Sequence, residues 1–277
     1  MRHYILLLSI CAATLTACEL QREYNGDLFP TEEARLVCFA ILGNETPPAV
    51  YLFPTQNVLD TASAQFLPNA LVELYRNGIL VEAMQFEGDK YIASPGFSPQ
   101  AGDAYQLEIR HTDYPELTSE VVIHPPLPEL ESIEWVYNAD SSRIIVTLVV
   151  AVAPIQSAED YAISAELYSA VTPTQLSSGS VRVSDATLLP NNRAQYQINT
   201  PVSVTIFEQF IPVDTVTVDR IKVNVRSFSD AYPRYFSTLP DGEFGGFFPP
   251  QDTLYSNFNG GYGIFFIQST TSSWIII

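Results

Sequence analysis

The sequence predicts an all-β protein whose exported part folds as two β-sandwich domains, after a lipoprotein signal peptide and a short tether. From Arg35 onward, apolar and polar residues alternate in most segments, which is the spacing of half-buried strands. Glycine, asparagine and proline separate these short runs, as expected for turns. Helical spacing of apolar residues is confined to residues 230–239, where Ala231, Tyr235 and Leu239 share one face.

Residues 1–17 have the form of a signal peptide. A weakly basic start precedes an apolar run over residues 5–15, which is too short for a membrane-spanning helix of about 20 residues. Residues 15–18, Leu-Thr-Ala-Cys, have the form of a lipobox. We expect cleavage before Cys18 and acylation of its thiol, which would hold the protein on the outer membrane by two or three acyl chains. An ordinary signal peptide with a chance cysteine is the alternative.

The charge balance excludes some classes of partner. The chain has 13 Lys+Arg against 31 Asp+Glu and a formal net charge of −18, and its basic residues are scattered. Nucleic-acid binding requires a basic face, so we expect no nucleic-acid partner. Anionic lipid surfaces are equally unfavourable for such an acidic chain.

The cysteines predict no disulfide in the mature chain. Cys11 leaves with the signal peptide, Cys18 is acylated, and Cys38 remains alone. Cys38 lies in an apolar run over residues 36–42 without an adjacent base. We therefore expect a buried thiol in the core and no reactive cysteine.

Residues 18–34 are polar and charged, as expected of a tether, and residues 35–125 are expected to form the first domain. Its hairpin is predicted around Asn77-Gly78, a strong turn signal between two extended runs. Tyr105, Leu107 and Ile109 alternate with polar neighbours, so these three should face a core. About seven short strands indicate an immunoglobulin-like or transthyretin-like sandwich.

Residues 126–277 are expected to form a second, mostly β domain. The proline-rich residues 124–128 suit a semi-rigid connector, because proline cannot donate a ladder hydrogen bond. A second hairpin is predicted over residues 133–152, and further strands over residues 161–168, 181–183, 202–206 and 221–226.

The C-terminal stretch is rich in glycine and aromatic residues. Its closing motif consists of Tyr255, Ser256, Asn257, Gly260, Gly261, Tyr262 and Gly263. We expect a tight turn or bulge at residues 259–261, a strand at residues 264–267 and a final strand in the apolar tail, residues 270–277. Two interpretations stay open: the motif is a structural turn that packs aromatics into the core, or it forms an exposed rim that contacts a partner. The spacing differs from that of a dinucleotide-binding loop.

The sequence predicts no catalytic, metal or cofactor site. His111 could pair with Asp113, but a turn residue at a strand end is the simpler interpretation, and His124 beside the prolines is expected to be exposed. No serine lies in a nucleophile elbow, and zinc-ligand spacings are absent. Residues 241–243, Asp-Gly-Glu, are the nearest approach to a calcium loop. A pair of carboxylates distant in sequence could still hydrolyse a glycoside.

Several segments resemble one known family. Residues 229–236 are similar to its Tyr-x-x-Tyr segment, and residues 255–265, Tyr-Ser-Asn-Phe-Asn-Gly-Gly-Tyr-Gly-Ile-Phe, are similar to its closing signature. Residues 69–75 and 102–109 extend the likeness into the first domain. The chain thus resembles the domain-of-unknown-function 4249 (DUF4249) lipoproteins of Bacteroidota. The resemblance implies no assigned activity; such proteins look like envelope lipoproteins that often accompany TonB-dependent outer-membrane receptors.

Together these observations predict a non-catalytic outer-membrane lipoprotein that acts as a binding or accessory module, with a TonB-dependent β-barrel receptor as its partner. A structural or adhesive surface spacer is the first alternative, and a hydrolase with dispersed carboxylates is the second. Glu19 after the lipid site favours surface display, but Gln21-Arg22 weakens that signal, so the membrane face stays open.

Overall fold

The computed structural model describes residues 33–45, 47–56, 65–153, 161–170, 177–181, 186–208, 211–239 and 254–277. From Ala34 onward these residues belong to one compact unit. The predicted signal peptide, the lipid site Cys18 and the acidic residues 241–243 lie outside the described residues.

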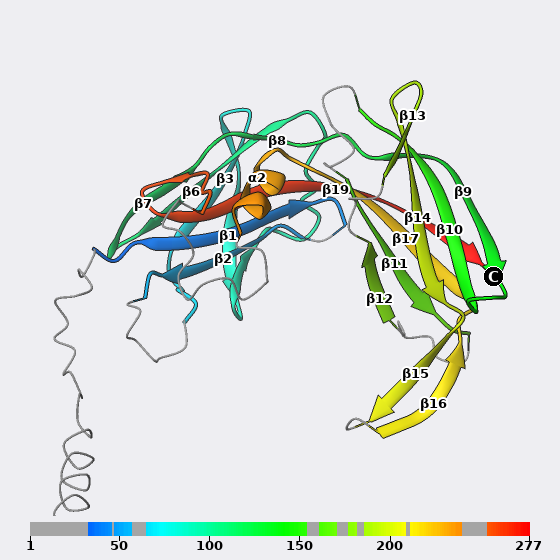
Figure 1. Cartoon of the computed structure of the whole chain (residues 1–277). Coiled ribbons are helices and arrows are strands. Elements are labelled where there is room, and N and C mark those ends of the chain that lie inside the picture. The colour runs from blue at the N-terminus through cyan, green and yellow to red at the C-terminus, as the bar shows by residue number, and fades with distance from the viewer. Residues whose placement is uncertain are drawn as a thin grey trace, which may run out of the picture. The chain divides into compact units, whose positions relative to one another are not determined.

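The described part of the chain consists almost entirely of strands (Figure 1), which confirms the all-β class. The strands of the first half are β1 (Leu36–Gly43), β2 (Ala49–Pro54), β3 (Leu71–Arg76), β4 (Ile79–Glu87), β5 (Lys90–Ile92), β6 (Ala104–His111), β7 (Tyr114–Ser119), β8 (Val122–Ile123), β9 (Glu129–Asn138) and β10 (Arg143–Ala151). They are followed by β11 (Tyr161–Tyr168), β12 (Ser177–Val181), β13 (Thr187–Leu189), β14 (Arg193–Pro201), β15 (Ser203–Glu208), β16 (Ile211–Thr217), β17 (Arg220–Phe228), α2 (Ala231–Thr238), β18 (Phe258–Asn259) and β19 (Tyr262–Ile276).

The long strand β19 connects the N-terminal and C-terminal strands. Its residues 262–268 pair in parallel with residues 37–43 of β1, and its residues 268–276 pair antiparallel with residues 220–228 of β17. Figure 1 shows β19 in red beside β1 in blue. The two short strands predicted for residues 264–267 and 270–277 are therefore parts of one strand.

Through β19 the described strands form a 13-stranded sheet of order β12-β11-β17-β19-β1-β2-β5-β4-β3-β6-β7-β18, with β8 paired to β6. A separate four-stranded sheet has the order β13-β14-β10-β9, and β15 pairs with β16.

Two large hydrophobic cores lie on either side of the predicted connector. The first consists mainly of residues between Leu36 and Val122, and the second of residues between Ile144 and Ile275. β19 contributes to both, through Phe265 and Ile267 to the first and through Ile275 to the second. Because both cores include residues of this strand, the cores alone do not divide the chain into two sandwich domains.

The alternation predicted from the sequence places the expected side chains in the first core. Tyr105, Leu107 and Ile109 on β6 are all buried, as predicted. Cys38 on β1 is fully buried, and burial raises the pKa of its thiol far above the ordinary value. The prediction of a core cysteine is confirmed.

The predicted hairpins are also confirmed. β3 and β4 pair around Asn77 and Gly78, which both have positive φ angles, 52° and 79°, as a two-residue hairpin turn requires. β9 and β10 pair around the turn after Asn138. The Asn138 Oδ1 accepts hydrogen bonds from the backbone amides of Asp140 and Ser141, at 3.1 and 3.2 Å, and so stabilises that turn.

The proline-rich segment of residues 124–128 packs against β17 and β19. Its carbonyl oxygens accept hydrogen bonds from side-chain hydroxyls: Ser269 donates to Pro125 (2.8 Å), Ser227 to Pro126 (2.8 Å) and Thr271 to Pro128 (2.7 Å). These hydroxyls provide hydrogen-bond donors to carbonyls that lie beside the sheet.

The prediction that His124 is exposed is wrong. Its backbone amide donates to the Asp103 carbonyl at 2.9 Å and its carbonyl accepts from the Gly102 amide at 3.0 Å, so the residue is held against the turn before β6. The ring is only 2% exposed, and Nδ1 lies 2.8 Å from the Pro125 carbonyl oxygen. Because a carbonyl only accepts, Nδ1 carries the proton, and the buried Nε2 has no hydrogen-bond partner among the described residues.

Candidate binding groove

The helix predicted over residues 230–239 forms as α2 and is fixed by an aromatic cluster. Tyr232 stacks on Phe228 of β17, with ring centroids 3.8 Å apart, and its ring lies 5.1 Å from that of Phe266 on β19. Ala231 is buried in the same cluster. This packing fixes the position of α2 relative to β17 and β19.

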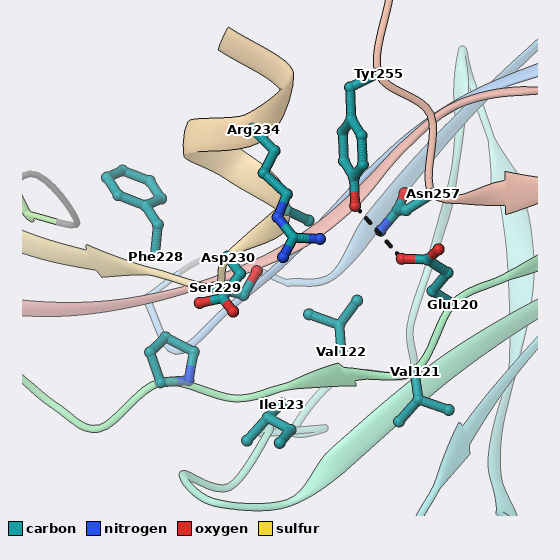
Figure 2. A pocket seen from close by; sticks show the side chains of 12 residues that line it. Glu120, Val121, Val122, Ile123, Phe228, Ser229, Asp230, Arg234, Tyr255 and Asn257 are labelled. Atoms are coloured by element: carbon teal, nitrogen blue, oxygen red, sulfur yellow. Dashed lines mark hydrogen bonds between the residues drawn. The ribbon is translucent and has the colours of Figure 1, made fainter. Parts of the chain in front are cut away.

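A groove of about 400 Å³ lies beside α2 (Figure 2). Three segments line it: residues 120–123 with Pro125, which include β8; residues 228–231 with Arg234, from the end of β17 into α2; and the start of the closing motif, Tyr255 and Asn257. The groove therefore depends on contacts between the first segment and two segments that lie more than 100 residues further along the chain.

Arg234 supplies the groove's positive charge. Figure 2 shows its guanidinium directed from α2 into the groove, 6.0 Å from the centroid of the Tyr255 ring, within reach of a cation–π interaction. Among the described residues, no carboxylate lies within 4 Å of this guanidinium. Arg234 can therefore bind an acidic group of a ligand.

Tyr255 and Glu120 form the polar wall opposite α2. The Tyr255 hydroxyl donates a hydrogen bond to Glu120 Oε2 at 3.4 Å. Burial raises the pKa of Tyr255, so the hydroxyl stays protonated at neutral pH and acts as a donor. Val122 lies beneath these groups and is nearly buried, and it gives the groove an apolar floor.

The other residues of the closing motif hold this wall in place. Asn257 is buried, and its side chain makes two hydrogen bonds to the backbone of Phe265. The backbone carbonyl of Asn257 accepts a hydrogen bond from the Glu120 backbone amide at 2.7 Å. Asn257 thus connects the polar wall to β19. Ser256 contributes a hydroxyl that accepts from the Phe258 amide at 3.3 Å.

The glycines of the motif permit close backbone approach. Gly260 has φ +89°, and a Cβ there would lie 2.0 Å from the Glu116 carbonyl oxygen. A Cβ on Gly261 would lie 2.4 Å from the Leu36 carbonyl oxygen. Gly263 has φ +128°, and a Cβ there would lie 1.8 Å from the Cys38 carbonyl oxygen. No larger residue fits at these positions without moving β1 or β7.

The aromatic residues of the motif and its neighbours divide between the core and the surface. Phe258, Phe265 and Phe266 are buried, as expected of a structural turn. Tyr255 lines the groove, and Tyr262 is 42% exposed beside Arg35, whose guanidinium lies 5.9 Å from its ring centroid.

Sequence reasoning missed Arg234, Glu120 and Asp230, which also line the groove. Arg234 and Asp230 fall within the Tyr-x-x-Tyr segment, residues 229–236, which was the one available signal for them. Glu120 carried no signal, because its role depends on contacts with distant residues.

His111, another candidate for chemistry, does not line the groove. His111 ends β6, and its Nδ1 accepts from the Asp113 amide at 3.2 Å, as expected of a residue at a turn. Within the described ranges, no group of three or more His, Cys, Asp or Glu is arranged to hold a metal ion. The same part of the chain contains no helix that is long and apolar enough to span a membrane.

The described residues define a mostly β fold with the short helix α2, in which a glycine-rich closing motif builds one wall of a partly apolar groove lined by Arg234, Glu120 and Asp230. The family model described as "Domain of unknown function (DUF4249)" matches residues 21–273. The chain belongs to this family, as the motifs of residues 229–236 and 255–265 predict. No curated protein matches the chain.

Proposed function

We propose that the protein is a non-catalytic, lipid-anchored binding module of the outer membrane, whose groove beside α2 contacts a TonB-dependent β-barrel receptor. The observation that carries this proposal is the groove itself. It presents the guanidinium of Arg234, with no carboxylate of the described residues within 4 Å, next to the Tyr255 hydroxyl and an apolar floor.

Such a groove suits a protein segment that carries an acidic side chain. A guanidinium binds carboxylates through two parallel hydrogen bonds, and tyrosine and arginine are enriched among residues that contribute most to protein interfaces. The aromatic cluster and Asn257 hold these groups in place before binding, which lowers the entropic cost of association.

The anchor is supported by where the family begins. The family match starts at residue 21, three residues after Cys18, so the signal peptide and the lipobox lie outside the shared domain. This is the arrangement expected when a removable leader precedes a folded body. The two core clusters on either side of residues 124–128 support the further proposal of two sandwich domains.

The two alternatives remain predictions. A spacer would contribute to attachment or envelope integrity, and its function would not depend on Arg234. A hydrolase would use two carboxylates, and Glu120 and Asp230 both line the groove.

Affinity purification tests the proposal. The tagged protein, extracted from membranes in mild detergent, should reproducibly copurify with a β-barrel receptor. A clean preparation without a reproducible partner would contradict the proposal. Loss of attachment in cells that lack the protein, with nutrient uptake unchanged, would favour the spacer.

A further inference from the structure

β9 is an edge strand of the four-stranded sheet. It pairs with β10 on one side, and no other described strand pairs with its second side. A bulge interrupts the register near Glu131, after which residues 132–138 form a regular run. Natural edge strands are usually protected by charged side chains, proline, bulges or short length. Beyond the bulge, the run of residues 132–138 contains no proline and one charged residue, Glu134.

The inner face of β9 carries aromatic residues that continue the apolar layer of the second core but are exposed to solvent. Trp135 pairs with Val146 and Tyr137 with Ile144, and both partners on β10 are fully buried. Directly opposite residues share one face of a sheet, so Trp135 and Tyr137 lie on the core side. They are nevertheless 42% and 52% exposed. The apolar layer therefore ends at an uncovered edge.

The outer face of β9 carries two glutamates and the exposed Val136. Glu134 lies on the face opposite to Trp135, and Glu129 lies before the bulge; both are exposed. Among the described residues neither forms an ion pair, whereas Glu131 is paired with Arg193 at 3.6 Å. A strand that adds to this edge would place alternate side chains against the aromatics and against Glu134.

We propose that β9 is a docking edge for an extended segment of another protein, which adds to the sheet as a strand. The segment alternates apolar residues, placed beside Trp135 and Tyr137, with basic residues placed beside Glu134. Its backbone pairs with the free edge of residues 132–138. A second copy of this chain is disfavoured as the occupant, because each copy carries a formal charge of −18 and brings the same glutamates to the edge.

A blocked peptide of about eight residues, an ordinary strand length, tests this proposal. It alternates lysine with valine and tyrosine. The chain has two tryptophans, Trp135 and Trp274, so Trp274→Phe in the full chain leaves Trp135 as the sole tryptophan, which is excited at a wavelength that tyrosine does not absorb. In detergent solution, the peptide should shift Trp135 emission to shorter wavelength in a saturable way. The same peptide with every amide N-methylated partitions into micelles but cannot pair, and should cause no saturable shift.

Charge reversal gives the matched control. Glu134→Lys should weaken binding of the lysine peptide about threefold, the effect of an exposed ion pair, and should strengthen binding of the corresponding glutamate peptide. Asp89→Lys, in the turn between β4 and β5, makes the same charge change away from β9 and should alter neither. The proposal is overturned if the methylated peptide binds equally well, if no saturable shift occurs, or if sedimentation shows a dimer that Glu134→Lys alters instead.

Discussion

The side chain of Asn257 pairs with the backbone of Phe265 as a neighbouring strand would. Its Nδ2 donates to the Phe265 carbonyl at 2.7 Å, and its Oδ1 accepts from the Phe265 amide at 2.9 Å. Both residues are buried. This pairing joins the groove wall to β19, the strand that both cores share.

Asn257→Ala should destabilise the protein by about 2–3 kcal/mol, because it leaves a buried amide and carbonyl of Phe265 without partners. Chemical denaturation measures the effect. Asn259→Ala is the matched control, since Asn259 is exposed two residues further on, and should change stability by less than about 0.5 kcal/mol. Equal effects of the two substitutions would show that the pairing contributes nothing.

Gly263→Ala should destabilise the protein by more than about 4 kcal/mol or prevent folding. The added methyl group would lie 1.8 Å from the Cys38 carbonyl oxygen, at a backbone φ of +128°, so β1 and β19 would have to separate. Gly78 also has a positive φ, but a Cβ added there meets no atom within 4 Å. Gly78→Ala should therefore lower the free energy of unfolding by only about 1–2 kcal/mol. Thermal unfolding of both variants checks the difference; a tolerated Gly263→Ala would mean that the parallel pairing of β1 with β19 is wrong.

Stability should fall as the pH drops below about 6.5, in part because of His124. Desolvation lowers the pKa of this buried ring, against smaller opposing effects of the Pro125 carbonyl and Asp103. The unfolded chain therefore takes up this proton at a higher pH than the folded chain does, so protonation favours unfolding. His124→Asn removes this contribution. Denaturation at several pH values between about 6.5 and 5 should show that the free energy of unfolding falls less for the variant than for the wild type. Equal pH dependence of the two proteins would contradict the role assigned to His124.

The local features of the fold were predictable from the sequence. The turn at Asn77 and Gly78, the core face of β6 and the short helix α2 each depend on residues close together in the chain. Their spacing and turn chemistry therefore determine their structure before any tertiary contact is considered.

The long-range features were not predictable in the same way. β19 joins β1 in parallel across more than 200 residues, and no local pattern encodes that partner. The prolines beside His124 predicted an exposed ring, but the fold places it against Ser269 in β19, whose hydroxyl lies 3.2 Å from Nδ1. The groove also depends on distant segments, so Arg234 could be found only once the fold was known.

Cys18→Ala should move the protein from the membrane fraction to the soluble fraction, because the acylated thiol would be its only lipid attachment. The folded body should unfold at an unchanged temperature. Cys11→Ala, within the predicted signal peptide, should stay in the membrane fraction and serves as the control. Immunoblotting of separated fractions measures the distribution. A Cys18→Ala protein that has lost its signal peptide and still remains with the membrane would contradict the anchor.

Quantitative affinity purification of groove variants tests the proposal that the groove beside α2 binds a receptor. Arg234→Glu reverses the charge that faces the groove, whereas Arg143→Glu makes the same change at an exposed position at the start of β10. Receptor recovery, measured by mass spectrometry, should fall at least about tenfold for Arg234→Glu, as expected for a residue that dominates an interface. It should be unchanged for Arg143→Glu. Equal receptor recovery with the wild type and Arg234→Glu would contradict the claim.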